Sequence, residues 1–408
     1  MKVVFRVNED AESFDAYVRS HPQGSMYQSC GWSLIKREWD SLRLVGESDG
    51  LIVCSALILI RRFPLGQKLF YIPRGPLWSD DSIATDFFDY IKSTAKKLGA
   101  FCVKFDPKVI LRQYDTQHII DSESDEVIQH VLSFDPDIVH KGFDQGLNTY
   151  AQPRYNAIVL AGEDMFERFS SSTKRNIKTA LKKNVSVDRF SDEKLTSFSR
   201  LMSLTEQRKS VSLRNMDYFK RFFDAFDKQA SLFIAQVNLR ENLLECQQQI
   251  RQLSASLDKA TTQSNAVKQQ RVQLEALIKE QEFLHQMKEK HGDVADVSGL
   301  LILIHGSVCE FLYSGMDADF SKLYPAYLMR FKAMEYARGQ GCTILNFGGI
   351  SGALDDGLWE FKRSFGSIVT EYIGEFDMIV RPNMYRLFET GLPFARRMMH
   401  RIKRLRSK

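Results

Sequence analysis

The sequence predicts an α/β fold made of two similar domains, with a helical hairpin inserted into the second. Residues 1–147 alternate strand and helix signals, and the same order of signals recurs downstream. Between residues 237 and 291 the composition changes, because glycine, proline and tryptophan are missing there. We therefore expect domains at 1–147 and 148–395, the hairpin at 237–291, and a basic tail at 396–408.

The first domain is expected to follow a strand–helix–strand–strand–helix–strand order. A helix is predicted at 31–42, because Trp32, Ile35 and Trp39 share one helical face. The next helix ends at a glycine, which is a common helix stop. The full set of predicted elements is strand 3–7, helix 31–42, paired strands 51–60 and 68–73, helix 82–99, and strand 100–107.

The second domain repeats the later part of that order. Paired strands at 299–306 and 308–315 precede a helix at 324–341 and a strand at 342–349. The stretches "KLGAFCVKFDP" and "GQGCTILNFGG" each join a helix stop, a buried strand and a turn. This recurrence predicts a structural repeat of two similar domains.

The window 237–291 carries a heptad pattern. Apolar residues are spaced alternately by four and three, first at Leu239, Leu243, Cys246, Ile250, Leu253, Leu257 and Ala260. After the polar stretch 261–265, a similar spacing resumes at Val267, Leu274, Leu277 and Leu284. Two such helices joined by a short polar turn predict an antiparallel coiled-coil hairpin, with a dimerising coiled coil as the alternative.

Charge and cysteine usage indicate where the protein acts. Net charge is +5, yet seven Lys and Arg residues and no acidic residue follow Glu389, so the basic character lies in the tail. Apolar residues interleave with these cations, which favours an amphipathic segment on an anionic membrane surface; a solvated helix end and RNA binding are the alternatives. Six scattered cysteines without a CxxC pair indicate reduced thiols. The longest apolar run, 51–60, is too short to cross a bilayer. We expect a cytoplasmic protein, peripheral at the inner face of the membrane.

Two residues stand out as candidates for chemistry. No hydrolase elbow, zinc-binding HExxH or P-loop is present. Lys362 lies in "FKRSFG", between aromatics and near glycines, and could stabilise a developing oxyanion or bind a phosphate. Asp106 follows a strand and precedes Pro107, and could act as a base or orient an amine. The plainer alternatives are a surface lysine and a turn-capping aspartate.

Scattered cations could recognise a diphosphate. Lys36 lies beside Trp32, Arg74 lies in the rigid loop "YIPRGP", and Arg208 and Arg214 flank "KSVSL". Such cations, brought together, suit phosphate oxygens, although each alone is more often a solvated surface charge.

In their order along the chain, several motifs together resemble one known family, the Fem-type peptidoglycan bridge-forming aminoacyltransferases. The similarity covers nearly the whole chain, and no single motif decides it. The matching stretches include "QSCGWSLIKREW", "YIPRGPL", "VKFDP", "QPRYN", "SSTKRNIKTA", "LTEQRKSVSLRNMDYF", "FLYSG", "LNFGGISG", "GLWEFKRSFG" and "EYIGEFD".

The resemblance implies two tandem domains of the acyl-CoA N-acyltransferase (GNAT) type and an activity that needs neither acyl-CoA, metal nor other cofactor. The donor would be an aminoacyl-tRNA, acting as co-substrate. The acceptor would be an amino group of the peptidoglycan stem peptide, or of a bridge residue on it, carried by lipid II or by a UDP-linked muramyl pentapeptide. The basic tail favours the lipid-linked form. Alanine, serine and glycine are all candidate amino acids, with alanine or serine favoured.

The resemblance also implies roles for single residues. Lys362 would stabilise the charge on the ester carbonyl oxygen and contact the tRNA end, in a pocket shaped by Phe361. Asp106 would lie near the accepting amine. Lys36 and either Arg208 or Arg214 would hold the substrate diphosphate, and Arg74 is a further substrate-binding candidate. Tyr218 and Tyr313 would line the peptide groove.

Two other classes remain open on sequence alone. One is a conventional acyl-CoA-dependent N-acyltransferase, although the basic-x-x-Gly-x-Gly turn that it needs is not found in the expected place. The other is a non-catalytic RNA- or membrane-binding module that uses the hairpin and the tail. The oligomeric state is left open, with a monomer as one alternative.

Overall fold

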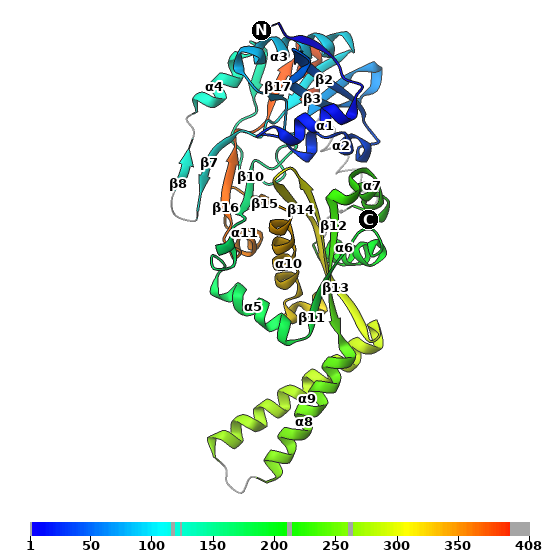
Figure 1. Cartoon of the computed structure of the whole chain (residues 1–408), viewed down its shortest axis with the longest axis vertical. Helices are drawn as coiled ribbons and strands as arrows, with labels where there is room; N and C mark the ends of the chain where they lie inside the picture. The colour runs from blue at the N-terminus through cyan, green and yellow to red at the C-terminus, as the bar shows by residue number, and fades with distance from the viewer. Residues whose placement is uncertain (1, 116–118, 123–124, 210–213, 260–263, 392–408) are drawn as a thin grey trace.

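A computed structural model of the chain describes residues 2–115, 119–122, 125–209, 214–259 and 264–391. Two α/β units are stacked along the long axis of the molecule, and a pair of long helices projects from the second unit, away from the first (Figure 1). Each unit is built on one mixed β-sheet. None of the described helices combines the length and the apolarity needed to cross a membrane.

The first sheet is antiparallel throughout, except where β4 and β6 run parallel. In spatial order its strands are β1 (Val4–Val7), β2 (Asp40–Ser48), β3 (Leu51–Arg62), β4 (Lys68–Ile72), β6 (Ala100–Phe105), β17 (Phe376–Ile379) and β9 (Ile138–His140), with β5 (Leu77–Trp78) paired to β3.

The second sheet likewise contains one parallel pair, β14 and β15. Its strands in spatial order are β11 (Val185–Phe190), β12 (Ala230–Asn238), β13 (Val294–His305), β14 (Val308–Met316), β15 (Ile344–Ile350), β10 (Tyr155–Leu160), β16 (Ile368–Tyr372), β7 (Ile110–Tyr114) and β8 (Ile119–Ser122).

The two sheets share one pairing pattern. Along each path, three antiparallel pairs are followed by one parallel pair and then by further antiparallel pairs, two in the first sheet and four in the second. In both sheets a helix connects the two parallel strands, as a parallel crossover requires. The predicted repeat and the predicted class, two tandem α/β domains of the N-acyltransferase type, are therefore confirmed.

The units exchange strands. β7 and β8, from the N-terminal part of the chain, extend the second sheet through β16, while β17, near the C-terminal end, lies between β6 and β9 in the first sheet. The division between the sheets thus does not coincide with the domain boundary that we predict at residue 147.

Helices cover both sheets and join the units. α3 packs on the first sheet, whereas α10 and α6 lie against the second. A single apolar cluster includes side chains of α1, α2, β3, α6 and α7, so the two units share a buried core. The helices are α1 (Ala11–Ser20), α2 (Cys30–Ile35), α3 (Asp81–Lys97), α4 (Glu126–Ser133), α5 (Ser171–Lys182), α6 (Leu195–Lys209), α7 (Met216–Phe226), α10 (Pro325–Gly339) and α11 (Gly357–Arg363).

The helix predicted at 31–42 is wrong in its second half. α2 ends at Ile35, and Asp40–Ser48 forms β2 instead. β2 pairs with both β1 and β3, and this long-range pairing outweighs the local helical pattern. Lys36 consequently lies at the end of α2 rather than within a helix.

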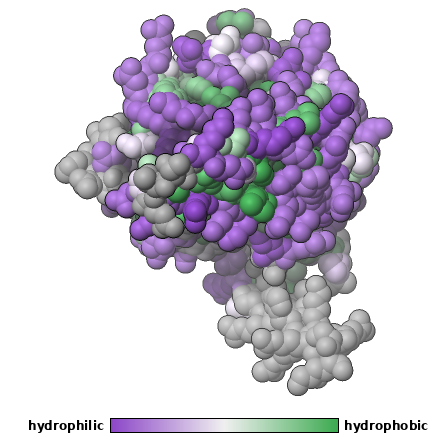
Figure 2. All heavy atoms as spheres, turned by 90° about the horizontal axis from the view of Figure 1, so that it is seen from below, coloured by the Kyte–Doolittle hydropathy of each residue, from purple (hydrophilic) through white to green (hydrophobic). Residues whose placement is uncertain are grey.

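The inserted segment forms two helices that pack against each other, α8 (Leu239–Asp258) and α9 (Asn265–His291). Their side chains are buried where the pair leaves the sheet, at Leu239, Leu243 and Cys246 on α8 and at Leu277, Leu284 and Met287 on α9. The predicted seam is therefore apolar near its base; supercoiling of the pair stays a prediction. Seen from below, the surface is mostly hydrophilic, with hydrophobic residues in small groups (Figure 2).

Candidate functional site

The end of the β4–β6 pair is closed by Asp106. This aspartate is only 2% exposed, and its Oδ1 accepts the backbone N–H of Arg74 (2.6 Å) while its Oδ2 accepts the Tyr71 hydroxyl (2.9 Å). Arg74 has a φ of 52°, a left-handed conformation that this hydrogen bond helps to hold. Burial raises the pKa of Asp106 to about 7, against the lowering effect of the Arg74 charge.

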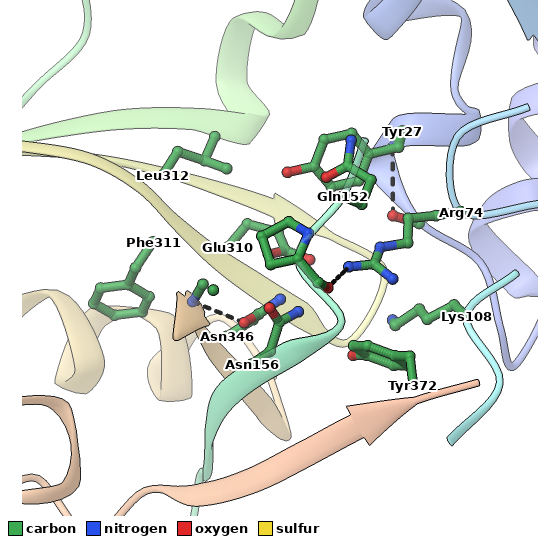
Figure 3. Close-up of a pocket in the computed structure, with 14 residues that line it drawn as sticks. Tyr27, Arg74, Lys108, Gln152, Asn156, Glu310, Phe311, Leu312, Asn346 and Tyr372 are labelled. Carbon is green, nitrogen blue, oxygen red and sulfur yellow. Dashed lines mark hydrogen bonds between the residues drawn. The ribbon is translucent and has the colours of Figure 1, made fainter. Parts of the chain in front are cut away.

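The equivalent β14–β15 pair opens instead into a pocket. The parallel pairing ends at Glu310 and Asn346, and beyond them Phe311 and Leu312 on β14 lie across a cavity of about 150 Å³ from Gly348 and Gly349 on β15. The remaining wall comes from both units: Ser25, Tyr27, Arg74, Lys108, Gln152, Pro153, Asn156 and Tyr372. Figure 3 shows Arg74 and Lys108 approaching from loops of the first unit toward the strands of the second.

The glycines of "LNFGGISG" permit this close packing. Gly348 has a φ of +80°, which an L side chain rarely adopts. A Cβ on Gly349 would lie 2.4 Å from Cγ of Pro153, so only glycine lets the backbone pass the opposite wall. Their carbonyls stay available as acceptors, and they face a lysine.

That lysine is Lys362, on α11. It is 5% exposed, and its Nζ donates to the carbonyl oxygens of Gly348 (3.1 Å) and Gly349 (2.8 Å). Asp356 caps α11 by accepting the Trp359 N–H (2.7 Å), which fixes the helix that carries the lysine. The simple alternative of a solvated surface lysine does not hold, because the ammonium lies against the backbone of the pocket.

Phe361 lies on another side of α11 from the pocket. Its ring contacts Tyr327 and Phe365, with centroids 5.1 and 5.4 Å apart, and the Arg330 guanidinium lies 4.9 Å from its centroid. It lines a second cavity of about 530 Å³, which is also bordered by Ser170 and Arg363. Phe361 thus lines this second cavity, whereas Lys362 contacts the Gly348–Gly349 backbone that borders the first.

Lys36 borders a groove on the first unit. Its Nζ lies 4.8 Å from the centroid of the Trp32 ring, in a cavity of about 230 Å³ that also involves Tyr71 and Gln152. Gln152 borders the pocket at β14–β15 as well, so the two hollows adjoin. Burial lowers the pKa of Lys36, and the nearby positive charge of Arg214 lowers it further.

The two arginines considered for diphosphate binding, Arg208 and Arg214, lie in different surroundings. Arg214 lies close to Lys36, as their electrostatic coupling requires, and its guanidinium is 5.0 Å from the centroid of the Tyr218 ring. The Tyr218 and Tyr313 hydroxyls are hydrogen-bonded at 3.0 Å, and Tyr313 follows the pocket residue Leu312. Arg208 is exposed on α6.

Several pocket residues escaped the sequence analysis. Lys108 and Glu310 are charged residues that line the pocket, and Asn156, Asn346 and Tyr372 add polar atoms. Glu310 is the charged residue inside the apolar strand stretch "VCEFLYSG". Because burying an isolated charge is costly, this position indicates a functional role. Lys108 directly follows the motif "VKFDP". No pattern in the sequence singles out the asparagines.

Nothing in the described part of the chain groups three or more His, Cys, Asp or Glu side chains as a metal site. All six cysteines are buried and free. Two repeated mixed sheets, with a lysine held where one parallel strand pair opens, define a tandem N-acyltransferase-type enzyme.

The chain belongs to the FemAB family, whose model matches residues 10–391. A curated relative, the lipid II:glycine glycyltransferase of Staphylococcus aureus, is 30% identical over 94% of both chains, and the same enzyme from several S. aureus strains matches equally. The crystal structure of FemX superposes with a TM-score of 0.77 at 27% identity, covering 95% of this chain and all of that one. The enzyme is thus an aminoacyltransferase of the Fem type.

Proposed function

We propose that the enzyme transfers an amino acid from aminoacyl-tRNA to an amino group of the peptide of lipid II, in the synthesis of the peptidoglycan interpeptide bridge. Membership of the FemAB family and the name of the S. aureus relative support lipid II as acceptor. The observation that carries the proposal is the Lys362 ammonium, held against Gly348 and Gly349 where the β14–β15 pair opens.

The reaction needs no outside energy source, because the ester of a charged tRNA is already activated. The acceptor amine attacks the ester carbonyl carbon, so that a C–N bond forms and the C–O bond to the tRNA ribose breaks. Charge builds on the carbonyl oxygen, and Lys362 stabilises it in a site shielded from water. The proton lost by the amine ends on the departing ribose oxygen. Asp106 acts indirectly, by accepting the Arg74 N–H and so fixing the loop that brings Arg74 to the pocket.

The remaining candidates bind the acceptor. Lys36 and Arg214, which lie near each other beside the Trp32 groove, hold the diphosphate of the carrier. Arg74 orders the loop between the groove and the pocket by donating to the Pro153 carbonyl (2.7 Å). Tyr218 and Tyr313 line the path of the peptide. Phe361 borders the cavity of about 530 Å³ and, by packing on Tyr327 and Phe365, helps to fix the helix that carries Lys362.

Glycine is the amino acid that the S. aureus relative's name favours, in place of the alanine or serine that the sequence alone favoured. The acceptor is membrane-linked, and the basic tail brings the enzyme to the inner face of the membrane. Residues 396–408 lie outside the described residues, so the tail is argued from charge alone.

A transfer assay tests the function directly. Radiolabelled glycyl-, alanyl- and seryl-tRNA are each incubated with lipid II or with the UDP-linked muramyl pentapeptide, with and without ribonuclease. Ribonuclease-sensitive transfer of glycine to lipid II is the expected result. Transfer from acetyl-CoA contradicts the proposed function. The absence of transfer from all three tRNAs to either acceptor contradicts it as well.

A sedimentation assay tests the tail. Removal of residues 396–408 should weaken binding to vesicles that contain anionic phosphatidylglycerol, and the difference should shrink at high salt. Equal binding with and without the tail refutes the anchor.

A further inference from the structure

In the described part of the chain, the β14–β15 pocket contains one buried acceptor without a donor and one buried carboxylate without an ion pair. Asn156, which is 5% exposed, has a buried Oδ1 without a hydrogen-bond partner. Glu310, which is 6% exposed, lies on the strand across the pocket from it. Among the residues that the structure describes, no Lys, Arg or His forms an ion pair with the Glu310 carboxylate. A buried carboxylate in this state is costly unless a ligand compensates it.

The two cations nearest to Glu310 are engaged elsewhere. Lys108 Nζ donates to the Gly24 carbonyl at 3.4 Å, and Arg74 donates to the Pro153 carbonyl while its guanidinium lies 4.5 Å from the centroid of the Tyr372 ring. Both cations act on Glu310 only through their electric field, which opposes the rise in its pKa that burial causes. Asn346 also opposes the rise in the Glu310 pKa, and its own Oδ1 accepts the Gly348 N–H (2.8 Å).

We propose that this pocket binds the primary amine of a reactant in its ammonium form, with Glu310 and the Asn156 Oδ1 accepting its N–H bonds. An ammonium group brings three donors and no acceptor, which matches a carboxylate and a free amide oxygen. Its bond to a carboxylate is charge-assisted and therefore strong.

The pocket stands next to the reacting centre. Gly348 and Gly349 border the pocket, and their carbonyls also hold Lys362. An amine bound by Glu310 would thus lie beside the carbonyl that Lys362 polarises. With the proposed function, the amine has two possible sources: the α-amino group of the donor amino acid, or the accepting amine of the peptide. Which reactant carries the amine depends on the proposed function. Binding of an amine in this pocket does not depend on it.

Small-molecule binding to the intact protein tests the site without any transfer. Glycinamide stands for the donor amino acid and Nα-acetyl-lysinamide for an accepting side-chain amine, and N-acetylglycinamide is the matched probe without a basic amine. We expect one of the two amines to bind in a calorimetric titration, and N-acetylglycinamide to bind at least roughly tenfold more weakly. Which amine binds identifies the source.

Glu310→Gln keeps the shape of the side chain but removes its charge. It should weaken binding of the amine by roughly tenfold or more, and Glu289→Gln, the same change on the exposed face of α9, should leave it unchanged. Asn156→Ala should weaken amine binding less than Glu310→Gln does. It is the variant to measure if Glu310→Gln does not fold. Equal affinity for the amine and its acetylated control, no binding of either amine, or wild-type affinity in both pocket variants overturns the proposal. If the transfer assay fails while the amine binds, only the proposed function is contradicted, and the amine site is not.

Discussion

The two parallel strand pairs, β4–β6 and β14–β15, occupy the same place in the repeat but end differently. The first pairs at five positions, from Lys68 and Ala100 to Ile72 and Phe105, and Asp106 then bridges to the next loop by accepting the Arg74 N–H. The second pairs at three positions and opens after Glu310 and Asn346. The Asp106 carboxylate closes the end of the β4–β6 pair. Gly348, Gly349 and Lys362 lie where the β14–β15 pair opens.

The difference indicates a division of labour within a duplicated fold. The closed end orders the loop that carries Arg74 and borders the groove of Lys36 through Tyr71. The open end brings together backbone carbonyls, an ammonium group and buried polar side chains. We therefore expect changes at the open end to lower kcat, and changes beside the closed end to act mainly on KM or on stability.

Lys362→Ala should have the largest effect. Loss of the ammonium removes stabilisation that exists only when charge develops on the carbonyl oxygen, so kcat should fall by about 100- to 1,000-fold, as for a lost oxyanion donor. The measurement is steady-state transfer to lipid II. Lys332→Ala, on α10 and paired with Glu335 at the surface, is the control and should stay active. A fully active Lys362→Ala enzyme would remove the basis for placing the chemistry at the open end.

Arg214→Ala should act on binding. Because Arg214 lies near Lys36 beside the groove, its loss should raise KM for lipid II by roughly tenfold with little change in kcat. The exposed Arg208 offers a matched control, and Arg208→Ala should leave both constants near wild type. If Arg208→Ala raises KM and Arg214→Ala does not, the diphosphate assignment moves to α6.

Asp106→Asn should have the smallest effect of the three variants. It should change the free energy of unfolding, and the size of this change should depend on pH. The pKa of Asp106 is raised from 3.8 to about 7, so between these values the folded protein holds a proton that the unfolded chain has lost. The contribution of Asp106 to stability therefore falls as pH rises through this range, and is lost fully above pH 7. Asparagine does not titrate.

Thermal unfolding of both proteins at pH 5 and pH 8 measures this difference. The melting temperature of Asp106→Asn relative to wild type should rise by several degrees between the two pH values. A constant difference would mean that Asp106 is ionised throughout, and that the closed end does not rest on a buried proton.

The sequence predicted the repeat because both halves carry the same local signals, strand pairs and glycine-stopped helices. It also indicated Lys362 and Asp106 through short motifs, and the structure shows both buried beside the parallel strand pairs, while their roles stay predictions. It missed β2, whose helical pattern is overruled by pairing with β1 and β3. It missed Glu310 and Asn156 as partners, because they meet only when β14 and β10 flank β15 in the sheet. Long-range pairing of this kind leaves no local trace.

The exchange of strands has a consequence for the order of synthesis. Among the strands that the structure describes, β9, at Ile138–His140, pairs in the first sheet only with β17, at Phe376–Ile379. A growing chain that has released its first 147 residues from the ribosome cannot yet complete that sheet, because the missing strand is made more than 200 residues later. The first sheet therefore stays incomplete, with one edge of β6 unpaired, until Phe376–Ile379 has been made. Chains that stop before β17 therefore expose this edge, which can pair with a strand of another chain.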